Sequence, residues 1–347
     1  MAAYTELSLT AQTAYAQLLE AALASEHARS VADLSGSFAS KTVRGAKYWY
    51  FQYTEPSGKL RQIFVGPDTD PVRALAARKA QLSAAAALGP LARSCAALGG
   101  AEMLPRHLRV LQRLAEYGFF RAGGVLIGTH AFLAFGNMLG VRWGDASRTQ
   151  DIDFAHAGKS LSLALPGDIR VQTHDAIESL QMGFLPVSGL ASKAGATYLN
   201  PREPDFKLDF VTTLHRKGVQ PYEHPQLGIT LQPLKFMEFS LENVQQAALF
   251  AGERCVVANV PHPARYALHK LLVYGEREGA FATKSGKDLL QAQLLLAYLK
   301  EHRASEVEEV WADLISRGPG WLRRARHGRA ALDKLAPALQ IKNWLRF

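Results

Sequence analysis

The stretch RTQDIDFA, residues 148–155, places two aspartates one residue apart among apolar neighbours. In an extended strand, residues two apart face the same way, so Asp151 and Asp153 share one face. Ile152 and Phe154 then occupy the opposite, apolar face. Two carboxylates held together repel each other, which raises the pKa of one of them unless a cation compensates. The spacing therefore predicts a site for a hard divalent cation, with a solvated edge strand or a lone salt bridge as the alternative.

A third carboxylate stands in a later strand-like stretch, FKLDFVT, residues 206–212. Its alternation turns the apolar side chains toward the core and leaves Asp209 on the other face, together with Lys207. Three carboxylates would complete a clamp for two metal ions, which lie roughly 3.5–4 Å apart in such sites. Asp205 has the same parity as Asp209 but follows a proline at the strand entrance, so it is the second choice.

A strand–turn–helix pattern precedes the aspartates. The sequence predicts a short strand at 124–127, a tight turn at Gly128 and Thr129, and a helix from His130 to about Leu139. Glycine lets the backbone approach a phosphate closely, and the free N–H groups of a helix start bind it. The threonine hydroxyl could add a hydrogen bond. The same two residues also suit an ordinary turn and helix N-cap.

The order of these motifs resembles the nucleotidyltransferase fold of the DNA polymerase β superfamily. The closer resemblance is to the bacterial minimal nucleotidyltransferases related to the abortive-infection toxins. Those proteins carry an Arg and a Thr just before Asp-x-Asp, matched here by Arg148 and Thr149. They also carry a later helix similar to PARYALHKL, residues 263–271, and then a helix with Lys-Asp, matched by Lys287 and Asp288. The resemblance covers roughly residues 120–300.

Two features depart from the pattern of that family. The second turn residue is Thr129, where the family has Gly or Ser. The spacer from Gly128 to Asp151 is long, so we expect the loop GVRWGDASR, residues 140–148, to be an insertion over the site. Neither departure removes the reason to expect that the three carboxylates bind metal ions.

The resemblance implies a Mg²⁺- or Mn²⁺-dependent enzyme that moves a nucleoside monophosphate from an NTP to a hydroxyl, with pyrophosphate leaving. The acceptor would be an RNA, a protein or a small molecule, and a toxin-like role would bring an antitoxin partner. Two ions would be held by the three catalytic carboxylates, Asp151, Asp153 and Asp209. Asp209 would hold the catalytic ion and help activate the acceptor hydroxyl. The nucleotide would contact Gly128, Thr129, Arg148 and Lys270.

Other readings of these residues stay open at this point. Lys270 also suits a surface position on an amphipathic helix, and Arg148 an ion pair with a nearby carboxylate. Lys287 and Asp288 also fit a charged helix start without chemistry. The alternative function is a nucleic-acid-binding protein that uses a nucleotidyltransferase scaffold without catalysis. The three carboxylates favour the enzyme.

The composition narrows the class of protein further. The 347 residues are 48% hydrophobic and 20% charged, and the net charge is +9 at pH 7, which favours polyanionic partners. The only two cysteines, Cys95 and Cys255, form no disulfide framework, so we expect a reducing, cytoplasmic location. No run is apolar enough to span a membrane. The sequence has no HExxH, GxxxxGK[ST] or GxSxG motif, which disfavours zinc hydrolases, P-loop enzymes and serine hydrolases.

The expected fold class is α+β, a nucleotidyltransferase-fold mixed sheet flanked by helices. We expect an N-terminal helical and β-hairpin module at 1–120, the nucleotidyltransferase core at 121–260 and a C-terminal helical region at 261–347. Helices are predicted over 5–26, 71–98, 105–117 and from 263 to the end. Further strands are predicted at 161–165, 183–189, 196–200 and 255–260.

The N-terminal hairpin combines aromatic and basic residues. Residues 41–62 carry five basic side chains against one acid, and they include the run YWYFQY. Alternation puts Tyr48 and Tyr50 on one face, with Trp49, Phe51 and Tyr53 on the other. One face must cover a core, and the second could stack bases unless both are buried. Four arginines of the C-terminal tail could extend the basic track: Arg323, Arg324, Arg326 and Arg329.

Overall fold

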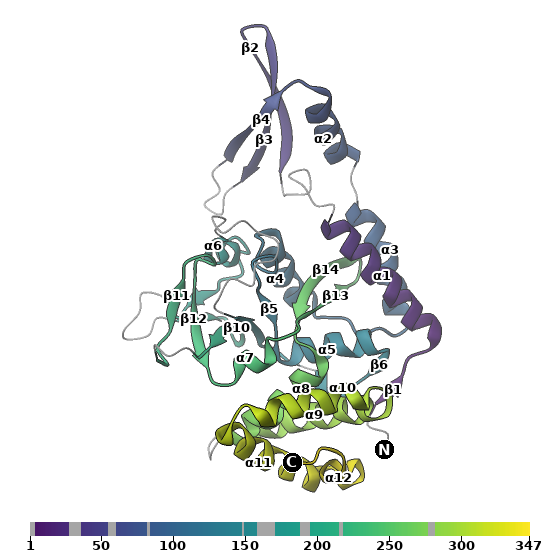
Figure 1. Ribbon diagram of the computed structural model, residues 1–347. Coiled ribbons are helices and arrows are strands. Elements are labelled where there is room, and N and C mark those ends of the chain that lie inside the picture. The colour runs from purple at the N-terminus through teal and green to yellow at the C-terminus, as the bar shows by residue number, and fades with distance from the viewer. Residues whose placement is uncertain are drawn as a thin grey trace.

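The computed structural model describes residues 4–27, 36–54, 60–81, 84–147, 149–157, 171–187, 195–214, 218–276 and 282–347. Its centre is a mixed sheet with a main path of five strands (Figure 1). The order is β11 (Tyr222–His224), β12 (Ile229–Leu234), β10 (Glu203–Thr213), β7 (Ile152–His156) and β5 (Val125–Leu126). The long strand β10 runs parallel to β12 and β7, while β5 is antiparallel to β7. Two short strands extend the sheet from β10: β9 (Thr197–Asn200) and β8 (Leu185–Pro186).

The two strands that carry the aspartates are anchored by their alternate, apolar residues. Phe154 of β7 and Phe210 of β10 are both buried and stack with their ring centroids 5.0 Å apart. Ile152 and Leu208, which face the same way, are fully buried. Burying these side chains on one side of the sheet leaves the carboxylates on the other side.

Helices flank the sheet, so the expected α+β class is confirmed. Helix α4 (Pro105–Glu116) begins at the predicted proline, and α5 (Gly128–Leu139) follows β5 directly. Figure 1 shows the C-terminal helices gathered at the base of the molecule. They are α8 (Pro263–Glu276), α9 (Ala282–His302), α10 (Ala304–Ser316), α11 (Pro319–Leu335) and α12 (Ile341–Trp344).

A second core lies between the N-terminal helices and a separate hairpin. Helices α1 (Leu9–His27) and α3 (Ala84–Ala97) pack together and against the antiparallel strands β13 (Gln245–Ala251) and β14 (Arg254–Val260). Leu18 and Phe250, both fully buried, belong to this cluster. Both cysteines, Cys95 and Cys255, are free thiols.

The N-terminal hairpin is part of a three-stranded sheet. Strands β2 (Ser37–Val43), β3 (Ala46–Thr54) and β4 (Leu60–Pro67) are antiparallel neighbours, and α2 (Asp70–Gln81) follows them. The extra strand β2 joins β3 through a two-residue turn in which Arg44 and Gly45 have φ of 51° and 83°. Turns with two positive φ angles match the twist of paired strands. Figure 1 shows this unit above the body of the molecule.

Several predicted boundaries differ from the structure. The helix predicted at 71–98 is two helices, α2 and α3, and the first helix begins at Leu9 rather than residue 5. Asp151 lies one residue before β7. The strand predicted at 161–165 falls outside the described residues. Of the one predicted at 183–189, the described part, 183–187, is a strand only at β8, Leu185–Pro186. Among the described residues, no helix is long and apolar enough to cross a membrane.

Two histidines meet in the core beside the sheet. Nδ1 of His107 lies 2.9 Å from Nε2 of His130, and the ring of His107 stacks on Phe206 at 4.8 Å. Burial lowers the pKa of His107 to about 4 and that of His130 to about 3. Both histidines are therefore neutral at physiological pH.

This pair is expected to make the fold sensitive to acid. Unfolded histidine has a pKa near 6.5, so below that pH the unfolded state binds protons that the folded pair excludes. The free energy of unfolding should fall between about pH 6.5 and pH 4 by about 3 kcal/mol for each histidine, since one pKa unit corresponds to about 1.4 kcal/mol. Urea unfolding at pH 7.5 and pH 5 should show a smaller loss for His107→Leu than for the wild type. The exposed His327→Leu should lose as much as the wild type, and equal losses in all three proteins would contradict the prediction.

Candidate active site

The aspartates of β7 and β10 come together across two parallel strands. Asp209 is the direct register partner of Asp153, so both carboxylates project from the same face at the same height. Asp151 lies two residues earlier, and its side chain is 29% exposed, compared with 23% for Asp209. The structure therefore brings the three predicted carboxylates to one place. Asp205 is exposed near the start of β10.

The crowding of these acids is visible in the pKa of Asp153. Burial, followed by the charge of Asp209 and then that of Asp151, raises the pKa of Asp153 to about 6. The ammonium groups of Lys270 and Lys207 oppose this shift without cancelling it. The charged form of Asp153 is therefore destabilised, and a cation bound beside it would stabilise that form.

One lysine of β10 already supplies a positive charge to the cluster. Nζ of Lys207 lies 3.2 Å from Oδ2 of Asp209 and 3.8 Å from Oδ2 of Asp151. Burial lowers the pKa of Lys207, but the two aspartates outweigh it and the net shift is upward. The other oxygen of Asp209 accepts a hydrogen bond of 2.6 Å from the hydroxyl of Thr197. Lys207 thus lies between two of the three predicted metal ligands.

The donor set suits a hard cation, although it is not preassembled. Among the described residues, no group of three or more His, Cys, Asp or Glu side chains is already arranged to hold a metal ion. Three carboxylates on one face of adjoining strands nevertheless offer the oxygen ligands that Mg²⁺ and Mn²⁺ take. The chemistry of these residues therefore fits the two ions that the sequence led us to expect, provided that Lys207 moves aside.

Gly128 leaves room for one of the carboxylates. Its φ of 63° lies in the left-handed region, and a Cβ at this position would be 2.2 Å from Oδ2 of Asp153. The backbone N–H of Ile127 donates to the carbonyl of Asp153 (2.9 Å), which fixes the two segments side by side. No larger residue fits this turn without displacing Asp153.

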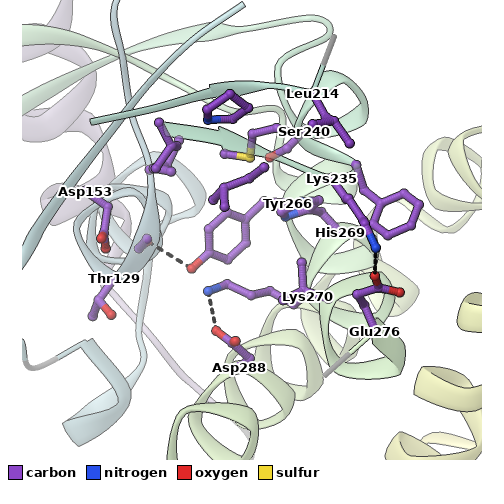
Figure 2. Close-up of a pocket in the computed structure, with 18 of the residues that line it drawn as sticks. Thr129, Asp153, Leu214, Lys235, Ser240, Tyr266, His269, Lys270, Glu276 and Asp288 are labelled. Atoms are coloured by element: carbon purple, nitrogen blue, oxygen red, sulfur yellow. Dashed lines mark hydrogen bonds and ion pairs between the residues drawn. The ribbon is translucent and has the colours of Figure 1, made fainter. Parts of the chain in front are cut away.

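A cavity of 530 Å³ opens in front of these residues (Figure 2). Its lining includes five of the predicted site residues: Gly128, Thr129, Asp151, Asp153 and Lys270. Asp209 is not part of that lining. The other end of the cavity is largely apolar, with Val211, Leu214, Val219, Leu234, Phe236 and Met237. The cavity thus joins a charged end to an apolar end.

Lys270 reaches the charged end from α8. Its ammonium is paired with the Asp288 carboxylate and lies 5.1 Å from the ring centroid of Tyr266. The side chain of Lys270 is only 15% exposed. Burial lowers the pKa of Lys270, but Tyr266, Asp288 and Asp153 outweigh burial and the net shift is upward. Lys270 therefore stays charged inside the cavity. The alternative of a surface lysine is wrong.

The Lys287–Asp288 pair does not stand at a helix start. Helix α9 begins at Ala282, so both residues lie inside it and line the cavity. Burial and the charge of Lys270 lower the pKa of Lys287, while Asp151 and Asp153 raise it less. The charges of both residues therefore act on the site, and the alternative of a charged helix start without chemistry is wrong.

A buried network that the sequence analysis did not identify holds the turn. The Tyr266 hydroxyl donates to the Gly128 carbonyl (2.9 Å) and lies 2.8 Å from Oε1 of Gln291. The amide of Gln291 donates to the Thr129 hydroxyl (3.3 Å) and to the Ala146 carbonyl (3.0 Å). No side chain caps α5. The sequence feature that could have indicated this network is the i,i+3 spacing of Asp288 and Gln291, which places both side chains on one face of the helix.

The remaining predicted residues have different outcomes. Arg148 lies outside the described residues, whereas Thr149 lines the cavity. The described part of the segment expected to be an insertion over the site, residues 140–147, packs against α5 and α9. Within it, Trp143 is buried and stacks on Phe132 at 4.9 Å.

The rim near the apolar end carries an ion-pair cluster that the sequence did not reveal. Lys235 and Glu276 both line the cavity and pair with each other. Arg324 of α11 also pairs with Glu276. Burial raises the pKa of Glu276, but its two cationic partners outweigh burial and lower it. These residues come from three distant segments, so only the fold unites them.

Comparison with known proteins places the chain in a family. None of the curated proteins searched matches the chain. Among solved structures, an antigenic nucleotidyltransferase-like protein from Paracoccidioides brasiliensis is similar with a TM-score of 0.30 and 13% identity, over 64% of this chain and 92% of that one. A family model described as Nucleotidyltransferase matches residues 106–316, which is more than half of the chain and includes all three aspartates. The protein therefore belongs to the nucleotidyltransferase family.

Proposed function

We propose that this protein transfers a nucleoside monophosphate from an NTP to an acceptor hydroxyl. The observation that carries the proposal is the pairing of Asp153 with Asp209 across β7 and β10, beside the Gly128 turn and a cavity. Family membership supports nucleotidyl transfer in general. The metal dependence and the roles of single residues are our inference.

The charged end of the cavity is suited to a triphosphate. Backbone N–H groups at the start of α5 would bind phosphate oxygens, and the Thr129 hydroxyl lies in the same lining. Lys270 and Lys287 would neutralise phosphate charge. Arg148 would add a bidentate contact. The apolar end would receive the base or the acceptor.

The carboxylates would carry the chemistry. The acceptor oxygen would bond to the α-phosphorus, the bond to the pyrophosphate oxygen would break, and the hydroxyl proton would pass to Asp209. Mg²⁺ or Mn²⁺ bound by Asp151, Asp153 and Asp209 would supply Lewis-acid stabilisation of charge on the phosphate oxygens. Lys207 would keep the carboxylates together before the nucleotide arrives.

We also propose the class of acceptor, the cellular role, the location and the domain division of the protein. The acceptor would be an RNA, a protein or a small molecule, and the likeness to abortive-infection toxins suggests a bacterial, toxin-like role with an antitoxin partner. Two unpaired cysteines suit the reducing cytoplasm. The three-part division at residues 120 and 260 remains a proposal.

The direct test is labelling. The protein would be incubated with each α-labelled NTP, Mg²⁺ or Mn²⁺, and either total RNA or cell lysate, with the Asp151→Asn/Asp153→Asn variant as the control. Label transferred by the wild type alone would support the proposal. The absence of both transfer and metal-dependent NTP binding would favour the alternative of a non-catalytic nucleic-acid-binding protein.

The same double variant is expected to change stability in a metal-dependent way. Asp153 has a folded pKa of about 6, above its unfolded value, so its ionisation destabilises the fold as pH rises from about 4 to 6. Without metal at pH 7.5, the variant should gain about 3 kcal/mol, since one pKa unit corresponds to about 1.4 kcal/mol. Mn²⁺ should stabilise only the wild type, because a ligand that binds the native state adds stability.

Thermal melts with and without Mn²⁺, repeated at pH 4 and pH 7.5, would check both parts. The advantage of the variant should vanish at pH 4. If Mn²⁺ raised the melting temperature of the variant as much as that of the wild type, the metal would bind elsewhere.

A further inference from the structure

Helix α2 packs on β2 and β4 and covers part of one face of the N-terminal sheet, where Ile63 stays 49% exposed. Phe51 of β3 is 1% exposed on that face. On the same face, Nε1–H of Trp49 donates to Asp68 (2.6 Å), in the link that leads into α2. A Cβ on Gly66 would lie 3.3 Å from Val72 of α2. Of the two faces that alternation left open, the Trp49 and Phe51 face therefore forms the small core.

The opposite face is an open platform of aromatic rings. Tyr50 is the register partner of Phe64, and Tyr48 that of Lys41. The ring centroids of Tyr50 and Tyr48 lie 5.6 Å and 6.0 Å from that of Phe64. Phe64 is 56% exposed although it is a large apolar ring. An exposed ring at the centre of such a group is typical of an interaction surface.

The charge around the rings is of one sign. The ammonium of Lys41 lies 5.0 Å from the ring centroid of Tyr50, and it donates to Gln62 on the same face. Arg44 stands in the turn between β2 and β3. Lys47 and Arg61 belong to the other face, because Lys47 lies 4.9 Å from the ring centroid of Trp49 and Arg61 is the register partner of Tyr53. Strands β2, β3 and β4 contain no Asp or Glu. Exposed rings with a lysine over them, and no acid on the three strands, match a polyanion whose bases have flat apolar faces.

The C-terminal arginines do not continue this platform. Arg324 is paired with Glu276, and the guanidinium groups of Arg326 and Arg329 lie 4.9 Å and 3.9 Å from the ring centroid of Phe347. Figure 1 places α11 at the end of the molecule away from β2–β4. The basic track expected from the hairpin to the tail is therefore wrong, and the sheet must act by itself.

We propose that the face formed by Lys41, Tyr48, Tyr50, Gln62 and Phe64 docks a single-stranded nucleic acid. Unpaired bases stack on the rings, and the phosphates pass near Lys41 and Arg44. A duplex hides its base faces, so the exposed rings favour a single strand. This docking does not depend on the transfer reaction, because the surface shares no residue with the cavity.

Fluorescence anisotropy with the full-length chain tests the docking directly. The probes are labelled 15-nucleotide single strands of RNA and of DNA with one mixed sequence, and the matching DNA duplex, all with EDTA and without NTP. Both single strands should bind more tightly than the duplex. The ratio of the dissociation constants for RNA and DNA shows which of the two nucleic acids the surface prefers. Binding should weaken steeply with salt because phosphate contacts release counterions.

Matched variants separate stacking from charge. Phe64→Ala should weaken single-strand binding about tenfold, the typical loss of one stacking ring, while Leu185→Ala should not. Leu185 is a suitable control because it is 58% exposed, close to the 56% of Phe64, but lies on β8. Lys41→Glu with Arg44→Glu should reduce affinity further and flatten the salt dependence. Asp153→Asn should bind as the wild type does, so a failed transfer reaction leaves this test intact.

Three outcomes would overturn the proposal. These are the absence of single-strand binding, equal or tighter binding of the duplex, and unchanged affinity of a folded Phe64→Ala variant. The melting temperature of Phe64→Ala should stay close to that of the wild type because the ring is exposed. That measurement distinguishes lost stacking from lost folding.

Discussion

Asp209→Asn is expected to lower turnover by about 10²–10⁴-fold, the range for loss of a positioned proton acceptor. Asp209 is paired in register with Asp153 and receives a hydrogen bond from Thr197, so its position in the sheet is fixed. The amide keeps the size of the side chain but removes its charge and its basicity. Affinity for the NTP should largely survive, because Gly128, Thr129 and Lys270 line the cavity and Asp209 does not.

The matched control is Asp205→Asn on the same strand. Asp205 has the same parity as Asp209, but it lies four residues earlier and is exposed. Steady-state kinetics should therefore show a large loss in turnover for the first variant and little for the second, with similar Michaelis constants for the NTP. Equal losses would mean that the third carboxylate is assigned to the wrong position.

The second large effect is expected from Gly128→Ala. An alanine Cβ would lie 2.2 Å from the Asp153 carboxylate, so Asp153 or the turn must move. A misplacement of about 1 Å in a reacting geometry can cost about 100-fold in rate, and we expect at least that loss. The left-handed backbone adds a stability cost of about 1–2 kcal/mol.

Gly144→Ala separates these two causes. Gly144 has a φ of 61°, close to the 63° of Gly128, but no atom lies within 4 Å of its Cβ position. Both variants should lose similar stability from the backbone, measured by urea unfolding, while only Gly128→Ala should lose activity and further stability. Equal activity of the two variants would contradict the role of Gly128 in seating Asp153.

The sequence determined which side chains share a face. Alternation in RTQDIDFA and FKLDFVT separated the aspartates from Phe154 and Phe210, and the structure keeps that separation because apolar side chains leave water at the same face of a strand. It also determined the strand–turn–helix order at Gly128 and the helix that begins at Pro105. These are local properties, set within a few residues by pleat, turn and helix geometry.

The tertiary structure alone decided which distant groups meet. The register of β7 against β10 places Asp153 beside Asp209, and the packing of α8 on α9 turns Lys270 and Asp288 into one buried ion pair. The placement of α2 selects which face of β3 is covered and leaves Phe64 exposed. Each outcome depends on contacts between residues far apart in the chain. Strand alternation and helix periodicity carry no information about which element lies opposite, and so these pairings come only from the packed fold.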